Sequence, residues 1–291
     1  MKEQKEPKEQ KTLKKKHYIL GHPLLWCVLA MPVIMIVYSV LKAVITIPLP
    51  ADTGSSEVYT MFYQLVDCLC YMLTSYLLLK LAQRSYGKSF HTGLTTVNLK
   101  KSVILSLGML IVMVLDVTNN LMDHNAHVVG MIPILSIILR GFTVGIAEEL
   151  GLRSFVIENA MQTWKNKKYG VMATMWVSAL GFGAMHLFNL TMPDENRTMI
   201  FIQVFYAAAI GVFFGAVYLR TRNLWGTILL HGLNDVESFY FLDASQAQEP
   251  TVRVVVMITI ASAAMIALGM YMVRKSKLHE VEEIWGIQKT E

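Results

Sequence analysis

Long apolar runs alternate with short polar segments along the whole chain. An α-helix needs about 20 predominantly apolar residues to cross the hydrocarbon core of a bilayer, and most of the runs are close to that length. The run 128–160 is long enough to tilt, kink or leave the membrane, whereas 102–118 is short. The pattern predicts an all-α, polytopic membrane protein with about eight transmembrane helices, at 24–47, 59–80, 102–118, 128–160, 170–189, 199–219, 224–241 and 252–273.

Composition agrees with a membrane protein. Of the 291 residues, 54% are hydrophobic and only 16% charged, against about 25% charged in a soluble domain. The net charge of +5 could suggest nucleic acid, but the basic residues cluster between the apolar runs, where they set topology. We therefore expect a lipid bilayer as partner and no nucleic acid. The cysteines lie in or beside apolar spans, so no disulfide framework is expected: Cys27, Cys68 and Cys70.

The basic residues fall in every second connecting segment, and the segments between them are mainly acidic. By the positive-inside rule this pattern places the N- and C-termini in the cytoplasm. We expect a multi-pass protein of the cell membrane. Three regions follow: a disordered basic cytoplasmic tail at 1–20, an eight-helix membrane domain at 21–275 with its core at about 128–241, and a cytoplasmic C-terminal tail at 276–291.

The sequence Glu148-Glu149-Leu-Gly-Leu-Arg153 places three ionisable groups on an apolar segment. Each such group near the bilayer centre costs roughly 2.5–3.5 kcal/mol on insertion scales. On an α-helix Glu149 and Arg153 share a face and can pair, whereas Glu148 is rotated by about 100°. This suggests a structural Glu149–Arg153 ion pair and a reactive Glu148. The alternative is that all three residues belong to a cytoplasmic helix end.

Two later spans carry further polar residues. Phe182 and His186 are four residues apart, so the ring can pack over the imidazole, although a lone histidine on an apolar span is more often a packing residue. His231 and Asp235 are also four apart, and a carboxylate that reaches an imidazole orients it and sets its tautomer. Convergence on one intramembrane site is the simplest reason for all three polar clusters.

Two chemistries fit a glutamate, two histidines and a further carboxyl group. The glutamate and the histidines could hold Zn²⁺ with an activated water, although the spacing His-Glu-x-x-His is absent. Alternatively, without metal, Glu148 deprotonates a water that attacks a carbonyl and His186 helps to place it. His231 and residue 235 would then stabilise the oxyanion. The residues alone leave both chemistries open.

The motifs Glu-Glu-x-x-x-Arg, Phe-x-x-x-His and His-x-x-x-Asn/Asp, in this order on successive spans, resemble the CPBP intramembrane proteases. This family includes type II CAAX prenyl endopeptidases and bacterial bacteriocin-processing and immunity proteins, also called the Abi family. The resemblance covers 148–235 and implies a glutamate-dependent endopeptidase without metal or cofactor. Carried over by position, the catalytic residues are Glu148, His186, His231 and Asp235, and the supporting residues are Glu149, Arg153 and Phe182.

One position departs from the family. The best-understood members have Asn where this chain has Asp235, and an ionised Asp would repel an oxyanion. Asp235 must therefore be protonated or orient His231 instead. Asn234 lies about 100° away around an α-helix and cannot simply substitute for it.

The substrate is less well defined. The short chain, the Lys-rich tail and the absence of organellar signals look more like a bacterial protein, for which a leader peptide, a secreted pheromone or a membrane protein is the expected substrate. A non-proteolytic immunity factor or regulatory scaffold of the same fold is the first alternative. A transporter or proton relay is the second, although the sequence lacks the repeated halves typical of transporters. The oligomeric state is not indicated.

Overall fold

The computed structural model describes residues 22–48, 57–87, 90–123, 129–191, 196–245 and 250–287. The tail predicted at 1–20 lies outside these residues. Every regular element within them is helical. The elements are α2 (Pro23–Thr46), α3 (Glu57–Tyr86), α4 (Leu99–Ser106), η2 (Leu107–Met109), α5 (Leu110–Met122), α6 (Met131–Glu148), η3 (Glu149–Ile157), α7 (Glu158–Trp164), α8 (Gly170–Met185), η4 (His186–Thr191), α9 (Arg197–Thr221), α10 (Trp225–Ser245), α11 (Val252–Met272), η5 (Lys275–Lys277) and α12 (Leu278–Trp285).

Seven helical segments of the described chain are long and apolar enough to cross a membrane, so the protein is an all-α, multi-pass membrane protein. Three of them are composite: Leu99–Met122 joins α4, η2 and α5, Met131–Trp164 joins α6, η3 and α7, and Gly170–Thr191 joins α8 and η4. The eighth expected span, α10, is also 21 residues long. It is not among the seven, because polar residues such as His231, Asp235 and Glu237 lower its hydropathy.

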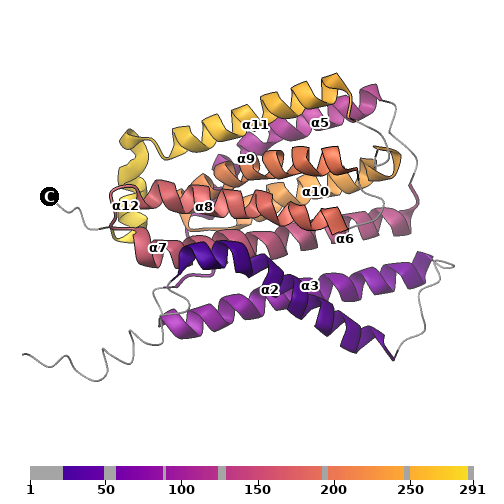
Figure 1. The fold of residues 1–291 in the computed structure, drawn as a ribbon, viewed down its shortest axis with the longest axis horizontal. Coiled ribbons are helices and arrows are strands. Elements are labelled where there is room, and N and C mark those ends of the chain that lie inside the picture. The colour runs from indigo at the N-terminus through magenta and orange to yellow at the C-terminus, as the bar shows by residue number, and fades with distance from the viewer. Residues whose placement is uncertain are drawn as a thin grey trace, which may run out of the picture.

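Helix α9 is the central element of the bundle (Figure 1). Nearly all of its second half is buried, and it packs against α8 on one side and α11 on another. Helix α6 packs against both α10 and α3. Helices α2 and α3, in indigo and violet, form the outer side of the bundle. The polar helix α10 therefore has protein neighbours on α6, α4 and α9, which shield its charged side chains from lipid.

Small residues allow the helices to approach closely. A Cβ atom on Gly145 would lie 2.9 Å from the backbone nitrogen of Gly232 on α10, and one on Gly211 would lie 2.8 Å from Cα of Ala179 on α8. Gly145 and Gly211 belong to the motifs Gly141-x-x-x-Gly145 and Gly211-x-x-x-Gly215, whose small-residue spacing permits close helix packing. Among the cysteines whose side chains are described, Cys68 and Cys70 are free and buried.

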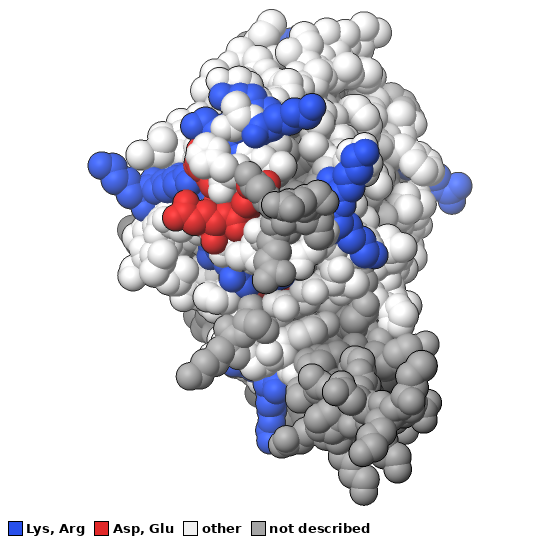
Figure 2. Space-filling model, turned by 90° about the vertical axis from the view of Figure 1, so that its left-hand side faces the viewer, with Lys and Arg blue, Asp and Glu red and all other residues white. Residues whose placement is uncertain are grey.

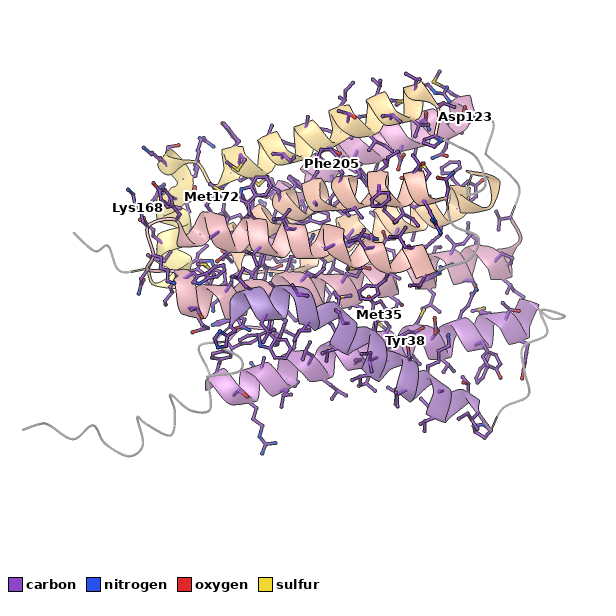
Figure 3. All side chains as sticks on the ribbon, in the orientation of Figure 1. Met35, Tyr38, Asp123, Lys168, Met172 and Phe205 are labelled. Atoms are coloured by element: carbon purple, nitrogen blue, oxygen red, sulfur yellow. The ribbon has the colours of Figure 1, made fainter. Side chains whose placement is uncertain are left out.

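The two ends of the bundle differ in charge. The start of α2 and the whole of α12 lie at the same end (Figure 1), and Lys168 lies there too, whereas Asp123 lies at the opposite end (Figure 3). Viewed from the α12 end, basic side chains gather around one acidic patch (Figure 2). The positive-inside rule assigns this end to the cytoplasm. This orientation stays a prediction, but an even number of crossings agrees with both described ends lying on one side.

Residues 276–287, expected as part of a tail, form most of η5 and α12, which cover the basic end of the bundle. The indole Nε1 of buried Trp285 donates to the carbonyl of Leu219 at the end of α9 (2.7 Å). Glu280 accepts hydrogen bonds or ion pairs from three basic side chains, Lys101 (2.7 Å), Arg220 (2.5 Å) and Lys277 (3.0 Å). These hydrogen bonds and ion pairs hold α12 against α4 and α9.

This arrangement predicts a pH-sensitive attachment of α12. Hydrogen bonds from Lys101, then Arg220 and Lys277, hold the pKa of Glu280 well below its usual range. A lowered carboxyl pKa contributes stability above the unfolded pKa, about 4.3, and this is lost as the pH falls further. At neutral pH Glu280→Gln should therefore speed amide hydrogen exchange in α12, and the difference between wild type and variant should shrink as the pH falls below about 4.3. The exposed Glu283→Gln on the same helix is the control. Equal exchange in wild type and Glu280→Gln at neutral pH would contradict this account.

Candidate functional site

The two glutamates stand at a change of helix type. Glu148 is the last residue of α6, and Glu149 begins η3, a π-helix in which every residue is buried. A π-helix has i→i+5 hydrogen bonds and often occurs at functional sites. The rotation of about 100° predicted between the glutamates assumed α-helical geometry, and Glu148 (φ −72°, ψ −40°) and Glu149 (φ −65°, ψ −38°) both have α-helical backbone angles. Nothing in the sequence signals the π-helix.

Close packing of α6 on α10 brings the glutamates to His231. Gly145 and Gly232 lie at the crossing point, where a Cβ atom on Gly232 would lie 2.6 Å from the ring of Phe142. His231 directly precedes Gly232 and is buried. The small residues therefore set the distance between the carboxyl groups on α6 and η3 and the imidazole on α10.

His231 lies between the two glutamates. Its Nδ1 is 3.0 Å from Oε1 of Glu149, a hydrogen bond, and its Nε2 is 3.5 Å from Oε2 of Glu148. Oδ2 of Asp235 is 3.7 Å from the same Nε2, beyond hydrogen-bond length. The orienting contact expected from Asp235 is thus made by Glu149 on another helix, and Nε2 faces two carboxyl groups.

Arg153 is fully buried beside this cluster. Its Nε is 3.4 Å from Oε1 of Glu149, and both side chains are 0% exposed, so the predicted Glu149–Arg153 ion pair is present. The guanidinium carbon also lies 4.3 Å from the centre of the Phe182 ring and 5.9 Å from that of Phe214. Within the described residues its nitrogens have no hydrogen-bond partner. One carboxylate and two aromatic faces therefore offset its buried charge.

Phe182 connects His186 to the rest of the cluster. Its ring centre is 5.4 Å from that of His186 and 5.5 Å from that of His231, with an edge contact in both cases. His186 ends α8 and begins the 3₁₀-helix η4, and it is less buried than His231. The predicted packing of Phe182 on His186 is present. His186 thus lies at the edge of the cluster and is partly buried.

The structure brings six of the seven predicted residues into one buried cluster. The seventh, His186, contacts this cluster through the ring of Phe182. Phe214 on α9 is part of the site but was not predicted from the sequence. Its ring lies 5.7 Å from that of His231. Nothing distinguishes Phe214 from the other apolar residues of a buried span. The full cluster comprises Glu148, Glu149, Arg153, Phe182, Phe214, His231 and Asp235.

The side chains of the cluster are mainly hydrogen-bond acceptors around one imidazole. In the described part of the chain no group of three or more His, Cys, Asp and Glu residues has an arrangement that could hold a metal ion. The carboxyl groups could position and deprotonate a water molecule, and the imidazole could donate to a developing negative charge. The metal-free chemistry expected from the resemblance stays a prediction.

The comparison with protein families agrees with this site. Residues 130–236 match the model of the Rce1-like family, described as type II CAAX prenyl endopeptidase Rce1-like. The match spans all the site residues and confirms the resemblance found from the three motifs. This segment of the chain is therefore similar to a family of type II CAAX prenyl endopeptidases. The chain matches no curated protein and no solved structure.

Proposed function

We propose that this protein is an intramembrane endopeptidase of the cell membrane that uses Glu148 to activate water. Its substrate would be a membrane-associated or leader-type peptide. The observation that carries the proposal is the position of His231 between Glu148 and Glu149, on helices held in contact by glycines. A buried array of charges at this depth is costly, and a hydrolytic site supplies a reason for it.

In the proposed reaction Glu148 accepts a proton from water while the water oxygen bonds to the peptide carbonyl carbon. The resulting tetrahedral oxyanion then collapses. The C–N bond breaks, the leaving nitrogen receives the proton, and the products are a carboxylic acid and an amine. His186, at the partly buried edge of the cluster, assists in placing the water. Because general-base catalysis typically contributes about 10²–10⁴-fold, Glu148 is the residue whose loss should matter most.

We assign the oxyanion contact to Nε2 of His231. Its Nδ1 donates to Glu149, so Nε2 carries a hydrogen only when the ring is protonated on both nitrogens. The nearby carboxyl groups of Glu148, Glu149 and Asp235 supply the counter-charge for this form. Asp235 then acts through His231 rather than on the oxyanion, which accommodates its difference from Asn.

The proposal is tested with purified protein in detergent and a library of peptides derived from membrane proteins and leaders. Products are identified by mass spectrometry for wild type, for Glu148→Gln and for the control Glu283→Gln, which makes the same chemical change on an exposed position of α12. Cleavage by wild type and the control, but not by Glu148→Gln, supports the peptidase. A library that no folded variant cleaves, together with a cellular phenotype that survives Glu148→Gln, would favour the scaffold.

Metal dependence is a separate prediction. Turnover should persist after exhaustive treatment with a zinc chelator, and the purified protein should contain no stoichiometric transition metal by elemental analysis. The physical reason is that, among the described residues, no group of three or more His, Cys, Asp and Glu side chains is placed to hold a transition metal. Loss of turnover in chelator, with recovery on adding Zn²⁺, would overturn the metal-free mechanism.

A further inference from the structure

A second group of buried polar side chains lies outside the proposed active site, between α5, α9 and α11. Asp116 and Asn119 on α5 and Tyr206 on α9 line a cavity of about 20 Å³ whose other walls are apolar. A cavity needs roughly 10–15 Å³ to hold one water molecule. The Asp116 cavity, as we call it, therefore has room for one water molecule or one small ion.

The polar atoms around this cavity need a ligand. Asn119 is only 9% exposed, and its Oδ1 has no hydrogen-bond partner within the described residues. The hydroxyl of Tyr206 is likewise buried without a partner there. Buried polar atoms are nearly always hydrogen-bonded or coordinated in folded proteins, because an unpaired one is destabilising. These oxygens therefore indicate a bound species.

Charge favours a cation over water alone. Glu237 on α10 repels Asp116 electrostatically. Both carboxyl oxygens of Glu237 are buried without a hydrogen-bond partner among the described residues. No lysine, arginine or histidine of the described chain forms an ion pair with either carboxyl group. Uncompensated carboxylates within a membrane are expensive and commonly mark ion sites. One monovalent cation, together with one proton kept on either carboxyl group, would neutralise the combined charge of Asp116 and Glu237.

We propose that the Asp116 cavity binds a single sodium ion through oxygen atoms of Asp116, Asn119 and Tyr206. Carboxylate, amide and hydroxyl oxygens are the ligands that hard cations prefer. The cavity has room for one small cation such as sodium. The proposal goes beyond the peptidase activity and does not depend on it.

A polar path leads from the cavity to the end of the bundle opposite α12. Asp116, Asn119 and Asp123 lie on one face of α5, because spacings of three, four and seven residues coincide on a helix. Asp116 is six residues from the end of α5, about 9 Å. Asp123 lies at that end (Figure 3) and pairs with Arg253 at the start of α11. An ion that reaches the cavity from this end of the bundle would pass the ion pair of Asp123 and Arg253.

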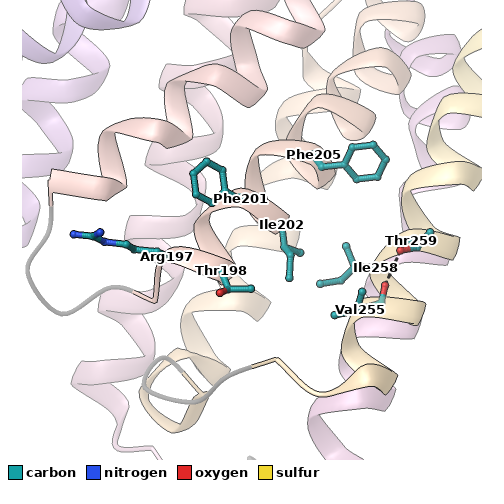
Figure 4. A pocket seen from close by; sticks show the side chains of 8 residues that line it. All are labelled: Arg197, Thr198, Phe201, Ile202, Phe205, Val255, Ile258 and Thr259. Atoms are coloured by element: carbon teal, nitrogen blue, oxygen red, sulfur yellow. Dashed lines mark hydrogen bonds between the residues drawn. The ribbon is translucent and has the colours of Figure 1, made fainter.

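The neighbouring groove on the other side of α9 and α11 is not the ion's path. It has a volume of about 450 Å³ and is lined mainly by apolar side chains such as Phe201, Phe205 and Val255, with Arg197 at one end pointing away (Figure 4). Ile258 borders both the groove and the cavity. An exposed apolar groove at this depth faces lipid chains, which exclude ions.

The test is thermal unfolding of purified protein in detergent, in buffers of equal ionic strength containing NaCl, KCl or choline chloride. A ligand that binds only the folded state raises the melting temperature, and we expect roughly 2–4 °C or more in saturating sodium. Tyr206→Phe removes only a hydroxyl group and should abolish most of this shift, as should Asp116→Asn. Thr118→Ala, on α5 but away from the cavity, should keep it.

Three outcomes would overturn the proposal. Equal melting of wild type in sodium and choline would mean that water alone fills the cavity. A larger effect of potassium than of sodium would contradict the assigned ion. A full sodium effect in Tyr206→Phe and Asp116→Asn would place the ion elsewhere. If the variants do not fold, binding of radioactive ²²Na⁺ to wild type decides: one ion per chain supports the site, and none overturns it.

Discussion

Glu148→Gln should fold and insert normally, but its peptidase turnover should fall at least about 10²- to 10⁴-fold. Glutamine keeps the shape of the side chain and can still hydrogen-bond, so the packing of α6 on α10 should survive. An amide cannot accept a proton from water at neutral pH, however, so the proposed first step fails. The change is measured as turnover per folded molecule, with membrane yield and thermal melting recorded in parallel.

The matched control for this prediction is Glu283→Gln, which should be indistinguishable from wild type in both turnover and melting. Full activity in a well-folded Glu148→Gln would show that Glu148 is not the base. If Glu149→Gln were at the same time stable and inactive, the base would be the neighbouring carboxyl group.

Glu149→Gln should instead be mainly a stability variant. Arg153 and Glu149 are both 0% exposed, and removing one partner of a buried ion pair costs about 3–5 kcal/mol. The rings of Phe182 and Phe214 can offset only part of the remaining charge of Arg153. Melting temperature and membrane yield should fall, and activity should fall with the folded fraction.

Hydrogen bonding distinguishes this variant further. The amide oxygen introduced by Glu149→Gln could still accept from Nδ1 of His231, so the folded fraction should retain a correctly oriented imidazole. Arg153→Met, which removes the charge and keeps a long apolar side chain, should partly rescue the stability of Glu149→Gln, because no unpaired buried charge is left. Unchanged melting in Glu149→Gln alone would contradict the structural role of the pair.

The helical membrane architecture could be predicted from the sequence because bilayer thickness fixes the length of an apolar helix. Helix α10 is an exception in its hydropathy. Its length is correct, but contacts with other helices let it carry His231, Asp235 and Glu237 at a composition too polar for a lipid-facing span. Hydropathy alone cannot distinguish a polar helix inside a bundle from one that lies outside the membrane.

The residues of the site could be predicted because buried charges are costly wherever they occur on an apolar segment. Their pairing could only partly be predicted. Helical spacing gave the Glu149–Arg153 pair, which lies on one helix, but not the contact between Glu149 and His231, which are 82 positions apart. That contact depends on the crossing of α6 and α10 at Gly145 and Gly232, and on the π-helix, which no sequence pattern indicated.

Single-turnover cleavage of a peptide identified in the library distinguishes the proposed role of Glu148 in activating water from a structural one. Wild type and Glu148→Gln are compared at equal concentrations of folded protein. We expect wild type to cleave one defined bond, and the rate to be at least about 10²-fold lower in a Glu148→Gln variant with unchanged melting. Equal rates in the two proteins would show that Glu148 does not activate the water.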